Sequence, residues 1–591
     1  MTPAAEYNRR LQEREAQVAQ LELTAARISN VRVVLAILFI VAAWWSARSA
    51  SFDYWWVAPL GLFIVAVIYH ARVRRAGARA ERAAAHYRAG IARIEDRWSG
   101  SGNPGTRFDD PHHVYAADLD LFGPGNLFEL LSIARTRMGE NALAAWLLSP
   151  SPITTIQERQ KSSGELRDRL DLREELAVLG ESAGVGVQPE QLVRWAESPN
   201  RLTAWWILPV ALLMPLLVIG AVVLWNSSGL VSPLIAILAI EYGVMRSLRN
   251  HLADVFRSTE EAFDNLRLLA ALTERLESEP VQTSLAKRLI AQLSSEGLRA
   301  SRAIGRLGTV VQFVESRRNF IIAILDLPLL YSVHAALAAE RWRRHHGHAV
   351  RVWLDTIGEI EALVSLSGYS YEHPDDPFPE IVEGEATFEA ESIGHPLLPQ
   401  ASCVRNDVTI AGGTRVLLIS GSNMSGKSTL LRTVGINTVL AMAGAPVRAQ
   451  RLRLTPLQVG ANIRINDSLH EGSSRFYAEI TRLRQLNELA ARMPPLLFLL
   501  DEVLQGTNSK DRFIGAQGVI RALLGRGAIG LVSTHDLALT EIEVAGSQRL
   551  RNLHFQDELV DGRMKFDFKL HEGIVTKSNG LELMRSIGLD V

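Results

Sequence analysis

Long uncharged stretches alternate with charged, helix-forming stretches in the first half of the chain. Residues 33–47 and 54–71 are apolar runs separated by a short link, and residues 202–225 and 230–245 form a second such pair. At 1.5 Å per residue, a helix over residues 202–225 is long enough to cross the roughly 30 Å hydrocarbon core of a bilayer. Because links this short join only antiparallel neighbours, the pattern predicts two α-helical transmembrane hairpins.

The run over residues 230–245 is shorter than the others and contains Glu241. A tilted span is the preferred interpretation, while a re-entrant or interfacial helix, or burial in a soluble core, stays open. Arginines gather on the segments that flank the hairpins, and the links inside them hold no basic residue except Arg48. By the positive-inside rule, we expect a multi-pass protein of the plasma or inner membrane with both large soluble segments in the cytoplasm.

Residues 320–339 are also apolar, but Asp326, Pro328 and His334 interrupt them. A fifth span would place the C-terminal part of the chain outside the cell. We therefore expect a buried core helix here.

In the last third of the chain the pattern changes to short, continuous apolar runs that end in glycine-rich or polar loops. Residues 416–420, 496–500 and 529–533 are such runs. Runs of this kind are typical of parallel strands that helices cover on both faces. The pattern predicts three segments: residues 1–80 with the first hairpin, a helical segment over residues 81–370 that the second hairpin interrupts, and an α/β domain over residues 371–591.

The first of these runs leads into a glycine loop of the phosphate-binding type. The loop consists of Gly421, Ser422, Asn423, Met424, Ser425, Gly426, Lys427, Ser428 and Thr429, and apolar residues follow at helical spacing. Backbone N–H groups of such a loop, together with the helix N-terminus, surround the α- and β-phosphates of ATP. We expect Lys427 to reach the β- and γ-phosphates and the Ser428 hydroxyl to ligate Mg²⁺.

Polar residues at the ends of the other two runs complete a candidate catalytic site. Asp501 is expected to hold Mg²⁺ through water, and Glu502 to orient or deprotonate the water that attacks the γ-phosphate. His535 follows the third run, where strand ends of an open α/β sheet meet at the ligand crevice. Alone, such residues are more often solvated strand ends, but the upstream loop favours catalytic roles.

Ser474 precedes an amphipathic segment over residues 476–489. A hydroxyl at a helix N-terminus suits a phosphate, but it also caps helices, and both interpretations stay open.

Composition sets limits on the partners. The formal net charge is −1, so any DNA contact requires a local basic patch. Such a patch is available on a helical stretch, although a solvated face is the alternative; its residues are Arg299, Arg302, Arg306, Arg317 and Arg318. The single cysteine, Cys403, excludes an internal disulfide.

Taken together, the motifs resemble those of the MutS family, whose glycine loop carries Asn-Met before Gly-Lys-Ser. The matching segments over residues 390–588 are Gly394–Leu397, Asn423–Thr429, Asp467–Phe476, Asp501–Glu502, Thr534–His535 and Thr576–Gly580. Further upstream, Leu127–Leu131 with Thr136 and Gly139 is similar to the start of the family's helical core, and Glu359–Ser365 to its end.

The resemblance implies an ABC-type P-loop ATPase domain preceded by an all-α lever domain. It also implies a homodimer that sandwiches ATP and Mg²⁺, with Ser474 acting in trans on the partner's nucleotide. The chain departs from the family where a mismatch-reading domain with a Phe-x-Glu wedge is expected, because apolar runs stand there instead. Cys403 stands where the family often has an aromatic residue stacked on adenine.

Three functions are compatible with these expectations. The first is a membrane-anchored MutS-like ATPase that still engages DNA in mismatch repair or recombination. The second is a mechanochemical ATPase that acts on a membrane protein partner without DNA. A nucleotide-switched scaffold with negligible turnover is a third alternative.

Overall fold

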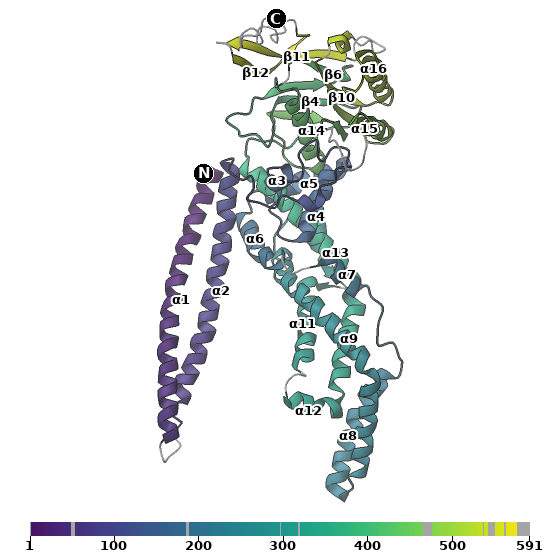
Figure 1. Ribbon diagram of the computed structural model, residues 1–591. Coiled ribbons are helices and arrows are strands. Elements are labelled where there is room, and N and C mark those ends of the chain that lie inside the picture. Colours follow the sequence, from purple (N-terminus) through teal and green to yellow (C-terminus); the bar gives the residue numbers. More distant parts are fainter. Residues whose placement is uncertain are drawn as a thin grey trace. The chain divides into compact units, whose positions relative to one another are not determined.

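The structure is a computed structural model, in which contacts divide the chain into two compact units (Figure 1). The first unit consists of residues 1–132, 144–178 and 366–591, and the second of residues 133–143 and 179–365. The described residues are 2–48, 54–184, 188–295, 297–316, 320–422, 424–464, 475–535, 537–541, 550–560 and 563–575.

Two long antiparallel helices begin the first unit, α1 (Pro3–Arg48) and α2 (Val57–Ile94). Helix α2 runs through residue 80 without interruption, so the sequence-based limit of the first segment falls inside a helix. The two predicted apolar runs lie at the linked ends of this pair, where large side chains such as Ile40 and Trp45 are exposed.

Within the described residues, three helices are long and apolar enough to cross a membrane: α1, α2 and α8 (Ile207–Ser228). Helix α9 (Ser232–Glu277), which contains residues 232–245 of the fourth predicted run, does not meet the same criterion of length and composition. A span over residues 230–245 therefore stays a prediction.

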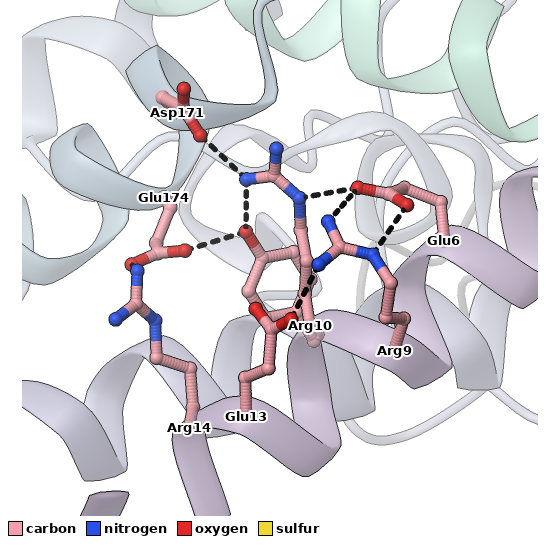
Figure 2. Close-up of polar contacts among 8 residues, drawn as sticks. Glu6, Arg9, Arg10, Glu13, Arg14, Asp171 and Glu174 are labelled. Atoms are coloured by element: carbon pink, nitrogen blue, oxygen red, sulfur yellow. Dashed lines mark hydrogen bonds and ion pairs between the residues drawn. The ribbon is translucent and has the colours of Figure 1, made fainter.

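A polar network connects the start of α1 and the end of α2 to helix α6 (Leu170–Gly184), as Figure 2 shows. Arg10 donates to Asp171 at 2.6 Å and to the Tyr87 hydroxyl at 3.1 Å. The Tyr87 hydroxyl in turn donates to Glu174 at 2.6 Å. Because several of these hydrogen bonds involve ionised groups, they are stronger than neutral ones and hold the helices in register.

The same helix pair is anchored to the end of α13 (Tyr331–Glu372), which leads into the α/β domain. Arg93 forms a buried ion pair with Glu372 at 2.6 Å, and the hydroxyl of buried Tyr7 donates to the same carboxylate at 3.3 Å. Breaking one partner of a buried ion pair leaves the other charge uncompensated, which is costly. The start of the chain is thus held against the entry to the α/β domain.

Short helices follow this pair along the chain. They are η1 (Thr106–Phe108), α3 (Leu127–Leu131), α4 (Arg137–Leu148) and α5 (Ile153–Leu166), and residues 137–143 of α4 belong to the second unit.

The α/β domain contains the predicted sheet. The six-stranded sheet has the order β12-β11-β6-β10-β9-β8, in which only the β11–β12 pair is antiparallel. Its strands are β6 (Val416–Ser420), β8 (Gln458–Asn462), β9 (Leu496–Asp501), β10 (Ile529–Thr534), β11 (Leu550–Val560) and β12 (Arg563–Glu572). The three predicted strands are confirmed as β6, β9 and β10, all adjacent in the sheet.

Helices and a second sheet complete this domain. The helices are α14 (Lys427–Ala443), α15 (Arg475–Leu489), α16 (Ser509–Gly525) and η2 (Leu537–Glu541). The four-stranded sheet, of order β3-β7-β4-β5, consists of β3 (Glu380–Ile381), β4 (Phe388–Ile393), β5 (Asn406–Ile410) and β7 (Arg451–Leu454).

A buried polar chain links α14 to the end of α13. Asn437 on α14 accepts the backbone N–H of Arg448 at 2.8 Å. The Arg448 guanidinium lies 3.5 Å from Asp376, which also accepts a hydrogen bond from Tyr369 on α13 at 3.2 Å. Since Arg448 and Asp376 are both buried, this chain fixes the helix after the glycine loop relative to α13.

The second unit is a helical bundle with a small hairpin of two strands. Besides α8, α9 and most of α13, it contains α7 (Pro189–Ala196), α10 (Ser284–Gln292), β1 (Ser294–Ser295), β2 (Leu298–Arg299), α11 (Ala300–Ser316) and α12 (Phe320–Leu329). The sequence segments assigned to the start and the end of a helical core meet here, because the Thr136 hydroxyl donates to the buried carboxylate of Glu361. Burial raises the pKa of Glu361 to about 7.

The single buried helix predicted over residues 320–339 is wrong. Helix α12 ends at Leu329, and Leu330 adopts the left-handed region (φ 45°) before α13 begins. Asp326 accepts hydrogen bonds from the backbone and the hydroxyl of Ser332, each at 2.7 Å, and so caps the new helix. Among the side chains that the structure describes in this stretch, Ile324 is 59% exposed whereas Leu330 is fully buried.

A proline inside α8 creates a contact between α8 and α13. Pro215 has no N–H, so the carbonyl of Ala211 loses the donor that a helix normally supplies four residues later. His334, near the start of α13, places Nε2 2.8 Å from that carbonyl oxygen. The histidine therefore supplies the missing donor and ties α8 to the long helix.

Replacing His334 with Ala is expected to lower the free energy of unfolding of the second unit by about 1–3 kcal/mol, the cost of leaving a buried carbonyl unpaired. His334→Gln retains a side-chain donor and serves as the control. Chemical denaturation of the purified variants measures the difference. Equal stability of the Ala variant and the parent would show that the contact is not formed.

Candidate nucleotide site

The glycine loop connects the centre of the sheet to α14. Strand β6 is buried along its whole length, and Gly426 precedes α14 in a left-handed conformation (φ 107°). A Cβ on Gly421 would lie 2.9 Å from Ser425 Oγ and 3.2 Å from the carbonyl oxygen of Phe555. Only glycine therefore allows the chain to turn this closely, and the turn leaves the free N–H groups of the α14 N-terminus at the loop.

Lys427 is the first residue of α14, and its side chain is only 4% exposed. Its ammonium donates to the carbonyl oxygens of Gly421 at 2.8 Å and Ser422 at 2.9 Å, and lies 3.6 Å from Glu502 Oε1. Burial lowers the pKa of Lys427, and the nearby carboxylates of Glu502 and Asp501 oppose that shift. The lysine thus holds a desolvated positive charge between the loop and the acidic pair.

Asp501 and Glu502 end strand β9 beside strand β10. The parallel register pairs Asp501 with Ser533, whose hydroxyl donates to the Asp501 carboxylate. Glu502 has a left-handed backbone (φ 49°) and donates its N–H to the carbonyl of Ser533 at 3.2 Å. Such a conformation is uncommon outside glycine and is frequent at functional sites.

This turn brings the Glu502 carboxylate close to two other predicted residues. Its Oε1 lies 3.5 Å from Nδ1 of His535 as well as 3.6 Å from Lys427 Nζ. Gln505 donates to its other carboxylate oxygen. A carboxylate held from three sides is suited to orient a water molecule.

The remaining loop residues differ in exposure. The hydroxyls of Ser422 and Ser425 are buried and have no hydrogen-bond partner among the described residues. Ser428 is half-buried in the first turn of α14, whereas Thr429 and Met424 are exposed. Asn423 and Ser474 lie outside the described residues, so their roles stay predictions.

These groups fit ATP and Mg²⁺. Buried hydroxyls without partners, a desolvated ammonium and a helix N-terminus are the donors that phosphate oxygens accept. A carboxylate and a hydroxyl, Asp501 and Ser428, are hard oxygen ligands of the type Mg²⁺ prefers. The geometry therefore agrees with the predicted roles without testing each of them.

A contact that the sequence did not predict links this site to the helical segment. Asp120 pairs with Arg432 on α14 at 3.1 Å and with Arg464, after β8, at 2.5 Å. Buried Asp118 accepts the backbone N–H groups of Ile463 at 2.8 Å and Arg464 at 2.6 Å. The segment holding these aspartates thus joins the glycine-loop helix to the residues immediately before the segment that contains Ser474.

Phe568 is a second residue that the sequence did not identify. It lies on β12 with a left-handed backbone (φ 55°) and an exposed ring. A Cβ on Gly426 would lie 3.3 Å from its Cδ1 atom, so the ring lies against the glycine loop. Asn406 fixes this strand by donating to the Phe568 carbonyl at 3.0 Å and accepting from the Leu570 N–H at 2.8 Å.

Comparison with known proteins places this domain. Residues 417–590 match the family model of MutS domain V. The chain is 35% identical over 196 residues to endonuclease MutS2 of Thermus thermophilus, covering 33% of this chain and 25% of that protein. It is 33% identical over 241 residues to DNA mismatch repair protein MutS 2 of Halobacterium salinarum, covering 39% of this chain and 27% of that protein.

A third relative gives the same result. The chain is 35% identical over 196 residues to DNA mismatch repair protein MutS of Exiguobacterium sp., covering 32% of this chain and 23% of that protein. The chain thus spans about a quarter of the length of the relatives it matches. The domain that positions Lys427, Asp501 and Glu502 is an ATPase domain that matches MutS domain V, an ABC-type ATPase domain.

Proposed function

We propose that this protein is a membrane-anchored ATPase that couples Mg²⁺-dependent ATP hydrolysis to movement of its helical segment. One observation carries the proposed ATPase activity. At the ends of β6, β9 and β10, the Glu502 carboxylate lies 3.6 Å from the Lys427 ammonium and 3.5 Å from the His535 ring. Residues 417–590 supply the matching family assignment.

The side chains at the site divide the work of hydrolysis. Lys427 and the α14 N-terminus bind the phosphates, and Ser428 and Asp501 hold the metal. Bound Mg²⁺ neutralises charge that develops on the phosphate oxygens. Glu502 orients and deprotonates the attacking water, while His535 keeps the Glu502 carboxylate aimed and senses the γ-phosphate. The exposed ring of Phe568 offers a surface on which the adenine base stacks beside the loop.

Exposed apolar surface supports the proposed membrane anchoring. Helices α1, α2 and α8 each contain an apolar stretch of 18 residues. In α1 and α2, 0% and 6% of the residues in this stretch are buried, and in α8 the share is 22%. Continuous exposed apolar surface of this extent requires a covering partner, and hydrocarbon is the partner that matches the helix lengths. Arginines on the flanking segments favour a cytoplasmic ATPase domain. In this arrangement the start of α9 crosses the membrane beside α8, in the opposite direction.

A homodimer completes the proposed catalytic unit. By resemblance, Ser474 of each chain contacts the nucleotide bound by the partner, so ATP stabilises the closed dimer. Confinement of two chains to one bilayer raises their effective concentration and favours this pairing.

DNA engagement is a second candidate function. Two relatives are named as DNA mismatch repair proteins, and Arg302 and Arg306 are exposed on α11. The alternative cargo is a membrane protein partner, which the apolar helices favour.

Phosphate contacts make DNA binding fall steeply with salt. Binding of branched DNA by the detergent-solubilised protein, with a steep salt slope, would support the DNA function, and no binding at low salt would eliminate it.

Glu502→Gln is expected to retain ATP but to hydrolyse it at least ~10²-fold more slowly, because the amide cannot accept the proton of the attacking water. Steady-state turnover and equilibrium ATP binding measure the two effects separately. Lys427→Ala is the contrasting variant, since it should weaken ATP binding itself. Normal turnover in Glu502→Gln would show that another group is the base.

The topology prediction concerns the two hairpins. Reporter fusions after Asn103, Ser227 and Val591 are expected to read cytoplasmic, external and cytoplasmic, because α8 and the start of α9 cross the membrane in opposite directions. An external signal at Val591 would mean that one of the four runs does not cross. A cytoplasmic signal at Ser227 would remove the second hairpin from the membrane.

A further inference from the structure

Glu241 lies where α9 packs along α8, on a helix face that is otherwise apolar. Its side chain is fully buried. The residues that α8 buries are Ile207, Ala211, Val218 and Ala221, whose spacing places them on one side of that helix. The next buried positions of α9 are Leu248 and Leu252. A carboxyl group therefore interrupts an apolar helix contact.

Neither carboxylate oxygen of Glu241 has a hydrogen-bond partner among the described residues. An ionised carboxylate in such a place loses its hydration and gains nothing in return, which costs far more free energy than apolar packing supplies. The group must therefore be a neutral acid while the two helices are packed, or it must be paired with a cation.

The described neighbours supply no cation. The buried face of α8 has no ionisable side chain. Helix α12 carries Asp326, which is bonded to Ser332, and His334 of α13 is bonded to the Ala211 carbonyl. On α9 itself, the nearest basic residues are Arg246 and Arg249, and both are exposed.

The position along the helix adds a second constraint. Glu241 comes nine residues after Ser232, so it lies about 14 Å from the start of α9 at 1.5 Å per residue. Helix α8 has 22 residues and is about 33 Å long by the same measure. With α8 across the bilayer, Glu241 lies near the middle of the hydrocarbon core, where ionisable residues are rare and mark functional sites.

We propose that Glu241 is a proton-binding site inside the second hairpin, a property that rests on the proposed membrane insertion. The carboxyl binds a proton from water when α8 and α9 pack together, and it releases that proton to water when the helices separate and the carboxylate is hydrated. Each opening of the hairpin thus releases one proton and each closing takes one up. Movement of this hairpin is therefore linked to pH.

Dicyclohexylcarbodiimide tests the site on the full-length protein in lipid vesicles. This apolar reagent enters hydrocarbon and reacts with a protonated carboxyl, whose O–H adds across a C=N bond to give an O-acylisourea that rearranges to a stable N-acylurea. Mass spectrometry should find the adduct on the peptide that contains Glu241, and labelling should fall as pH rises. A water-soluble carbodiimide should not label this peptide.

Variants on the same helix provide the controls. E241Q should abolish labelling of the peptide, whereas E261Q, which changes an exposed carboxylate of α9, should leave it unchanged. ATP turnover of E241Q in detergent reports whether the variant is folded.

Failure of this proposal is distinguishable from failure of membrane insertion. No adduct at any pH, with an external reporter signal at Ser227, would overturn the proton site and leave the hairpin in place. Labelling by the water-soluble reagent, with a cytoplasmic signal at Ser227, would overturn membrane insertion. A carbodiimide-dependent cross-link from Glu241 to a second chain would show that a cationic amine of that chain, rather than a proton, neutralises the carboxylate. That result would overturn the proposal.

Discussion

The structure of the ATPase domain depends on keeping the Lys427 ammonium out of water and close to the Glu502 carboxylate. Desolvation opposes the charge, and the carbonyls of Gly421 and Ser422 together with Glu502 compensate for it. That arrangement requires a loop that turns within a few residues, which only glycine allows at position 421. It also requires that β6 and β9 end beside each other. Strand β10 lies between them and pairs in parallel with both, so that Thr534 faces Ser420 and Ser533 faces Asp501.

Contacts inside the first unit offer a physical route from this site to the helices. On α14, Arg432 pairs with Asp120, and Asn437 bonds to the backbone of Arg448, which pairs with Asp376 in the loop after α13. Glu372 on the last turn of α13 then binds Arg93 of α2. A change at the glycine loop that moves α14 therefore acts on both the connecting segment and the α1–α2 pair. These contacts are the basis for treating the helical segment as a lever.

Much of this domain could be predicted from the sequence because its determinants are local. Strands β6, β9 and β10 are continuous apolar runs, and Gly426-Lys427-Ser428 follows directly on one of them. Asp501 and Glu502 follow one of these runs, and the upstream glycine loop favours catalytic roles for them over a solvated strand end. The apolar runs inside α1, α2 and α8 are equally accessible to sequence analysis, since they contain no charged residue.

The rest depended on contacts between residues far apart in the sequence. Asp120 and Phe568 carry no local signal, because their importance arises only when Arg432 and Gly426 are brought beside them. The helix break at Leu330 was missed because apolar composition does not reveal that Asp326 caps the helix after it. Likewise, His334 was interpreted as an interruption, whereas it supplies the donor that Pro215 removes from α8.

ATP bound at the glycine loop is expected to change the position of the helical segment. Pulsed electron spin resonance measures this directly, with spin labels on cysteines introduced at exposed Arg302 of α11 and exposed Lys510 of α16, in a Cys403→Ser background. Addition of Glu502→Gln holds ATP in place. Saturating ATP and Mg²⁺ are expected to shift the distribution of distances between the two labels. An unchanged distribution, in protein shown to bind ATP, would contradict this expectation.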